Sequence, residues 1–142
     1  MSTQNQAGIE AAVHYPLGDA LPEVGGSIEV APGVRWIRMR LPFALDHINL
    51  WLLRDEIDGD QGWTIVDCGI ANDETRASWE RVFATQLEGL PVLRVIVTHM
   101  HPDHVGLSQW LCEKWNVPLW ISMTDYLTSQ LLSCKAGGAA VA

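Results

Sequence analysis

The chain has 142 residues, of which 48% are hydrophobic, so it is long enough for one domain with a sizeable core and is not disordered in composition. Its formal net charge is -8, its pI is about 4.9, and it contains no run rich in Lys and Arg. We therefore expect no general binding to nucleic acid and no binding to anionic membranes, because both carry negative charge that repels an acidic protein.

The amino-terminal segment and the cysteines bear on the cellular compartment. The segment MSTQNQAGIEAAVHYPLGDA has neither the basic start nor the apolar core of a signal peptide, and no apolar run approaches the length of a membrane span. Cys68, Cys112 and Cys134 form no CxxC pattern and match no usual zinc spacing. These features favour a cytoplasmic protein with reduced thiols.

The first half of the chain predicts β-structure. Residues 1–26 are weakly patterned, and we expect an irregular lead-in there. Four apolar runs that follow predict strands over residues 27–30, 34–41, 48–54 and 63–67. The first two strands are separated by a turn at Ala31-Pro32-Gly33, and the last two by DEIDGDQG (55–62), which we expect to be a polar hairpin loop.

The second half alternates helices and strands. A helix capped by Asn72 or Asp73 is expected to end before Gly89 and Pro91, and a β-branched run predicts a buried strand over 92–98. A helix from near His104 and a short strand over 118–121 follow. Ser122, with Asp125 three residues later, resembles a capping box with Asp in place of Glu, and predicts a helix to about Ser133 before a small-residue tail (134–142). The order predicts an α/β fold, an α+β layered domain with a mixed sheet.

The stretch VTHMHPDHVG (97–106) contains three of the five histidines of the chain. In an extended segment after the 92–98 strand, His99 and His101 point to the same side, so the two imidazoles can bind one metal ion. Pro102 favours a bend, so Asp103 and His104 leave in another direction and can serve a second ion or orient the first ligands. Imidazole with carboxylate suits Zn²⁺, and Fe or Mn are also compatible.

Other residues of functional types receive structural interpretations. We expect His47 to be packed or at a strand edge, and His14 to lie at the surface of the lead-in. Trp110 and Trp115 lie at helical spacing and are expected to be core residues rather than a platform for substrate.

The histidine stretch and its surroundings resemble a known family. THMHPDH (98–104), after the strand VLRVIV, resembles the HxHxDH signature of metallo-β-lactamase-fold hydrolases. TIVDCG (64–69) is similar to the family's strand that ends in Asp and Gly before the first helix, and FALDHINLWLLRD (43–55) to the strand before it. The order and spacing agree over 27–133, and the style of HPDHVGLSQWL is most similar to the glyoxalase-II-like members.

The resemblance implies the amino-terminal half of an αββα sandwich and a metal-dependent hydrolase. Metal-bound hydroxide would attack a thioester, a lactone or a phosphoester, with a small molecule as substrate. His99 and His101 would bind the first zinc ion, and Asp103 and His104 the second, with Asp103 also orienting or deprotonating the attacking water. Asp67 would support these ligands from behind, although a strand-end Asp that caps the next turn would have the same sequence.

The chain departs from the family after the histidine motif. The family's second half supplies a further histidine to each metal and a bridging aspartate, whereas no histidine follows His104 here. We therefore expect a fragment of a longer protein, with one sheet face left uncovered. Two alternatives stay open. One is a catalytically incomplete metal-binding or interaction module that self-associates through this face; the other is a mononuclear iron dioxygenase of the same fold.

Overall fold

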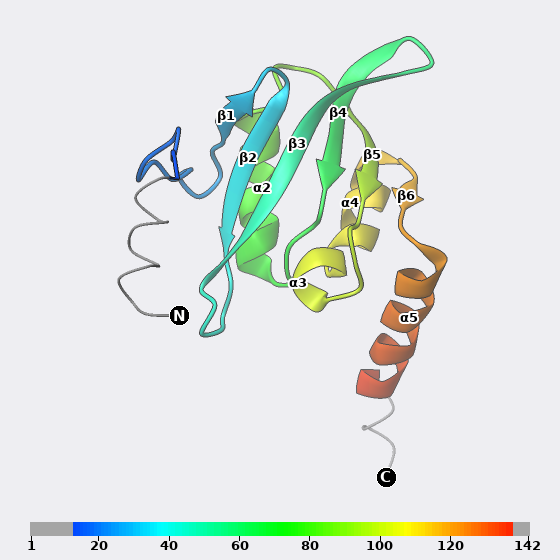
Figure 1. Cartoon of the computed structure of the whole chain (residues 1–142). Coiled ribbons are helices and arrows are strands. Elements are labelled where there is room, and N and C mark those ends of the chain that lie inside the picture. Colours follow the sequence, from blue (N-terminus) through cyan, green and yellow to red (C-terminus); the bar gives the residue numbers. More distant parts are fainter. Residues whose placement is uncertain (1–12, 138–142) are drawn as a thin grey trace.

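The computed structural model describes residues 13–137 of the chain, and the outer parts of the lead-in and of the tail lie outside the described residues. Figure 1 shows a single sheet with helices behind it and the last helix, in orange and red, beside its lower right corner. In chain order the elements are β1 (Ile28–Ala31), β2 (Val34–Arg40), β3 (His47–Ile57), β4 (Asp60–Val66), α2 (Asp73–Thr85), β5 (Val92–Ile96), α3 (Pro102–Val105), α4 (Ser108–Trp115), β6 (Leu119–Trp120) and α5 (Met123–Gly137).

The six strands form one mixed sheet in the order β1-β2-β3-β4-β5-β6, which confirms the predicted α/β class. β1 to β4 are joined by turns and pair antiparallel. β4, β5 and β6 are joined through helices and pair parallel, because a crossover is needed to bring the next strand back in the same direction. The carboxyl ends of β4 and β5 therefore lie at the same edge of the sheet.

One face of the sheet carries the core. Alternate residues of the central strands, such as Ile37, Leu50 and Ile65, are fully buried and face the helices. Trp79 of α2 and Leu111 of α4 are fully buried against them. Side chains alternate between the two faces of a strand and repeat every 3.6 residues in a helix, so strands and helices each present one apolar side. These sides pack against each other and form a two-layer domain.

The opposite face of the sheet has no covering layer among the described elements (Figure 1). The strand register places six apolar side chains in one row across this face: Ile28, Trp36, Trp51, Val66, Ile96 and Trp120. Trp120, on the last strand, is 54% exposed. The uncovered face that we expected from the sequence is present, and we call this set of six side chains the apolar row.

A polar link on the same face joins the antiparallel and parallel parts of the sheet. Arg94 of β5 donates to Asp55 of β3 at 2.6 Å, and Thr64 of the intervening β4 also donates to this carboxylate. The Thr64 hydrogen bond and the Arg94 guanidinium lower the pKa of the Asp55 carboxyl below its ordinary value.

The prediction of a polar hairpin loop over residues 55–62 is wrong. β3 continues to Ile57 and β4 begins at Asp60, so most of this segment is strand. The chain reverses at Asp58 and Gly59, which both have positive φ angles, 53° and 88°. Asp-Gly is the sequence preferred by a two-residue hairpin turn, and the charged residues on either side tolerate strand because they face solvent.

The helices follow the predicted pattern with two differences. Asn72 is the N-cap of α2 and accepts a hydrogen bond from the Thr75 amide at 2.7 Å, as one of the two predicted caps. The single helix expected from near His104 is interrupted at Gly106 and Leu107, which divide it into α3 and α4. The last helix, α5, continues past the expected end at Ser133 to Gly137.

The tryptophans of α4 behave as core residues, as predicted. Trp110 and Trp115 are half-buried and pack around Phe83 of α2, with ring centroids 6.3 Å and 5.2 Å from that of Phe83. Across residues 13–137, no helix has the length and apolar character that crossing a membrane requires.

Candidate metal centre

The histidine stretch lies at the edge of the sheet where β4 and β5 end (Figure 1). Asp67 follows β4 directly, and residues 97–101 connect β5 to α3, which begins at Pro102. The first turn of α3 then carries Asp103 and His104. Residues from two neighbouring strand ends and one helix therefore meet at one place, where parallel strands of α/β proteins usually present their active residues.

Asp67 is the buried centre of this arrangement. The residue is 4% exposed, and its carboxylate accepts hydrogen bonds from Thr98 in the β5–α3 connection and from His104 in α3. The Thr98 amide donates to Oδ1 at 2.8 Å, the Thr98 hydroxyl lies 2.9 Å from Oδ2, and His104 Nδ1 lies 2.9 Å from Oδ2. Its backbone adopts φ of 63°, a left-handed conformation that Asp tolerates better than most residues.

The hydrogen-bond network assigns the tautomer of His99. The Thr98 hydroxyl donates its proton to Asp67, so its oxygen is left to accept from His99 Nδ1–H at 3.0 Å. The lone pair of His99 then lies on Nε2, which is 3.0 Å from Nδ1 of His101. Two ring nitrogens, one from each imidazole, therefore face each other on the same side of the chain.

His104 is oriented by the same carboxylate. Because its Nδ1–H donates to Asp67, the lone pair lies on Nε2, and this atom faces the Asp103 carboxylate at 3.5 Å. A lone pair and a carboxylate oxygen are both acceptors, so a cation or a proton between them is favourable. The His99 and His104 rings are close, with centroids 3.9 Å apart, so the two pairs of residues adjoin.

The four predicted ligands suit a metal in chemistry, and they are arranged as two pairs. Among the described residues, no group of three or more His, Cys, Asp or Glu side chains converges in the manner of a complete metal site. Two nitrogens that share a tetrahedral zinc lie about 3.3 Å apart, given Zn–N bonds of about 2.05 Å. The observed 3.0 Å between His99 and His101 differs from this by a small rotation of the side chains, so the pair fits a shared ion.

Two residues that the sequence interpretation had not assigned to the site contact it. Thr98 connects Asp67 to His99, and its position immediately before the motif was the available signal. Asp125 of α5 was interpreted as part of a capping box, yet its Oδ1 accepts a hydrogen bond from the Met100 amide at 3.1 Å, between the two histidines. No local pattern predicts this contact, because it joins residues 25 positions apart.

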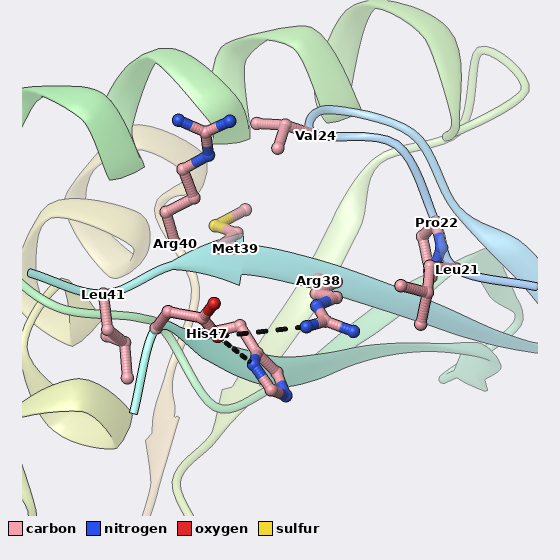
Figure 2. Close-up of a pocket in the computed structure, with 9 residues that line it drawn as sticks. Leu21, Pro22, Val24, Arg38, Met39, Arg40, Leu41 and His47 are labelled. Atoms are coloured by element: carbon pink, nitrogen blue, oxygen red, sulfur yellow. Dashed lines mark hydrogen bonds and ion pairs between the residues drawn. The ribbon is translucent and has the colours of Figure 1, made fainter. Parts of the chain in front are cut away.

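The remaining histidines lie outside the centre. His14 is exposed, as predicted. His47 begins β3, is half-buried and lies 2.6 Å from Asp46, and this hydrogen bond lowers the pKa of the Asp46 carboxyl. The pair borders a cavity of about 420 Å³ at the end of β2, whose lining is Leu21, Pro22, Val24, Arg38, Met39, Arg40, Leu41, Asp46 and His47. In Figure 2, Arg40 points to the opposite side of β2 from Arg38 and His47, so the cationic groups do not converge on one ligand.

Cys68 and Cys112 are packed away from this centre. Cys68 follows Asp67 but is fully buried in the core, and this burial raises the pKa of its thiol well above the ordinary value. Burial also raises the pKa of the half-buried Cys112 thiol. High thiol pKa values disfavour the thiolate that binds metal, so both cysteines are packing residues.

Comparison with known proteins identifies the family. Residues 44–129, more than half of the chain, match the model of the family described as the metallo-beta-lactamase superfamily. The chain belongs to the metallo-β-lactamase superfamily. The matched range includes Asp67 and the whole histidine motif. The resemblance to this family that the sequence indicated is therefore confirmed. The superfamily consists mostly of hydrolases, and its fold implies a metal cofactor.

Solved structures agree with this membership in the metallo-β-lactamase superfamily. A crystal structure of a β-lactamase domain protein from Burkholderia ambifaria is 61% identical and covers 82% of this chain with a TM-score of 0.81, while the chain spans 38% of that protein. The metallo-β-lactamase DIM-1 (16% identity, 75% of this chain, 46% of its own, TM-score 0.58) and the metallo-β-lactamase from Pontibacter korlensis (15%, 75%, 47%, 0.57) share the fold. A comparison with curated proteins gave no match.

Proposed function

We propose that the chain carries the first part of the active site of a zinc-dependent hydrolase. In this proposal His99 and His101 bind one zinc ion, and Asp103 and His104 bind a second. The main support is the buried Asp67 carboxylate, which binds His104 directly and His99 through Thr98. Both contacts are made at Nδ1, so the Nε2 lone pairs of His99 and His104 are available to a cation. Superfamily membership supports the same chemistry.

The roles of the protein groups follow from their positions. Asp103 lies on the first turn of α3 beside His104 Nε2, where a carboxylate can orient a water molecule and accept its proton. Bound zinc would supply Lewis acidity and bring the pKa of a coordinated water to about 7. We propose a small-molecule substrate with an electrophilic carbonyl or phosphoryl centre, which is a thioester, a lactone or a phosphoester.

Zinc binding tests this proposal most directly. The full chain should bind zinc in competition with a chromogenic chelator, and His101→Ala should weaken the affinity by about tenfold or more, because one of two facing donors is lost. His14→Ala, at an exposed histidine outside the centre, is the matched control and should keep the wild-type affinity. Equal affinities of the two variants, or no zinc binding by the wild-type chain, would contradict the proposal. Elemental analysis distinguishes zinc from iron or manganese.

The second candidate is a metal-binding module that associates with a second copy of itself. The apolar row on the uncovered sheet face favours it, because a soluble monomer rarely exposes a continuous apolar band across a whole sheet. Light scattering at several protein concentrations tests this candidate, and a monodisperse monomer at all of them contradicts it.

A further inference from the structure

Asp125 makes contacts that a helix cap alone does not need. Its Oδ2 accepts from the Ser122 hydroxyl at 2.5 Å, and its amide donates to the Ser122 oxygen at 3.1 Å, which closes the first turn of α5. In a capping box the carboxylate would also accept from the backbone amide of the cap residue. Here the second oxygen, Oδ1, accepts instead from the amide of Met100, in the β5–α3 connection.

The position of Met100 gives this bond its importance. Met100 separates His99 from His101, and the 3.0 Å approach of their ring nitrogens depends on the backbone conformation of the residue between them. The amide before His99, that of Thr98, is held by Asp67 at 2.8 Å. The amide after it is held by Asp125 at 3.1 Å. Two carboxylates, one directly after β4 and one in α5, therefore hold the backbone amides of the residues before and after His99.

The Asp125 carboxylate also provides a hydrogen-bond acceptor where the backbone lacks one. The Val97 amide still donates to the Trp120 carbonyl at 2.9 Å, but from Thr98 to His101 the connection is neither strand nor helix, so these amides lack the regular partners of a sheet or a helix. Oδ1 of Asp125 supplies an acceptor for one of these amides, that of Met100, while Oδ2 stays with the Ser122 hydroxyl, so the side chain restricts the loop at this residue. This restriction favours the arrangement in which both imidazoles point to one site.

We propose that Asp125 is a positioning residue for the metal centre: by holding the Met100 amide, it sets the approach of His99 and His101 before an ion binds. This inference rests on the proposed zinc-binding function of the two histidines. It assigns a role in the centre to α5, an element that supplies no metal ligand in the proposal. It also predicts that zinc affinity and helix capping can be separated by mutation.

The experiment compares three variants of the full chain by zinc competition with a chromogenic chelator and by thermal unfolding of the metal-free form. Asp125→Ala should lower zinc affinity by about tenfold, the usual scale for groups that orient metal ligands. Ser122→Ala removes the hydroxyl of the cap but leaves the acceptor for Met100, so it should lower the unfolding midpoint and keep zinc affinity near the wild-type value. Asp125→Asn keeps a carbonyl oxygen for the amide and should recover most of the affinity.

The outcomes separate this inference from the proposed function. Wild-type affinity in a folded Asp125→Ala variant, or an equal loss of affinity in Ser122→Ala, would overturn the positioning role. If Asp125→Ala does not fold, amide exchange in the wild-type chain decides: slow exchange at Met100 supports the bond, and exchange at the rate of an exposed loop amide refutes it. Failure of the wild-type chain to bind zinc would overturn the proposed function, whatever the exchange rate of Met100.

Discussion

At the scale of single residues, Asp67 determines the tautomers of His99 and His104. It accepts from Thr98 and from His104, and the Thr98 oxygen in turn accepts from His99. One buried carboxylate therefore fixes two tautomers, one directly and one through a hydroxyl group. Burial makes this arrangement effective, because Asp67 is 4% exposed as a residue and few water molecules can compete for its hydrogen bonds.

Asp67→Asn tests this arrangement. The amide group presents one acceptor and one donor, so either Thr98 or His104 loses its partner, and a donor then faces another donor. We expect the free energy of unfolding to fall by about 1–3 kcal/mol in urea denaturation. Zinc affinity should fall about 10–100-fold in chelator competition, because the orientation of the imidazoles is lost.

The matched control for Asp67→Asn is Asp73→Asn. Asp73 is an exposed carboxylate in the first turn of α2 that pairs with the neighbouring Arg76 at 2.9 Å. A surface pair of this kind contributes little to stability, so this variant should resemble the wild-type chain in both measurements. Equal behaviour of the two variants would show that the hydrogen bonds of Asp67 are not what holds the histidines.

At the scale of elements, the interruption between α3 and α4 lets two loops approach closely. Gly106 has a helical backbone, with φ of -52° and ψ of -48°, so its conformation does not require glycine. A Cβ atom at this position would lie 2.8 Å from the Ala71 amide nitrogen and 2.8 Å from the Gly69 carbonyl oxygen. Glycine is needed here for space, because the connection after β4 passes directly over the end of α3.

Gly106→Ala should therefore destabilise the protein despite the higher helix propensity of alanine. We expect a loss of roughly 1–3 kcal/mol in urea denaturation, as for other substitutions that overpack a close contact. Zinc affinity should also fall, since α3 carries Asp103 and His104 and must move away from the strand ends.

Gly26→Ala is the matched control for this element, because a Cβ at Gly26 would make only ordinary contacts, 3.4 Å or more from its neighbours. This variant should unfold at the same urea concentration as the wild-type chain. An unchanged urea midpoint for Gly106→Ala would mean that the connection after β4 can move away from the added methyl group without loss of stability.

At the scale of the whole molecule, the sheet is covered on one side and open on the other. The apolar row crosses all six strands on the open face and ends at Trp120, which is 54% exposed. Arg94 lies over the Trp120 ring at 4.7 Å and covers part of it. A second copy of the chain presents the same band, so two open faces can bury each other.

Self-association through this face is testable with Trp120→Glu. The apparent mass of the wild-type chain in light scattering should rise with concentration. The dissociation constant of the variant dimer should be roughly tenfold higher, because a charge replaces a large apolar contact. Phe43→Glu, at a residue that is 58% exposed on the β2–β3 loop, is the control and should associate like the wild-type chain. If neither variant differs from the wild type, the apolar row is not the interface.

The sequence by itself determined the order of the elements, the mixed sheet and the grouping of His99, His101, Asp103 and His104 after a buried strand. These features are local: they depend on periodicity, on cap and turn residues, and on spacing within one segment. The error at residues 55–62 was also local, because the polar composition of the segment outweighed the Asp58-Gly59 turn signal that lay within it.

Only the tertiary structure decided which distant groups orient the histidines. Asp67 reaches Thr98 across 31 positions, and Asp125 reaches Met100 across 25 positions, and neither pairing has a signature in the sequence around it. The same holds for the apolar row, whose members belong to six strands and are aligned by register alone. Long-range hydrogen bonds and strand register arise when the chain packs, so they follow from the three-dimensional arrangement and not from any one segment.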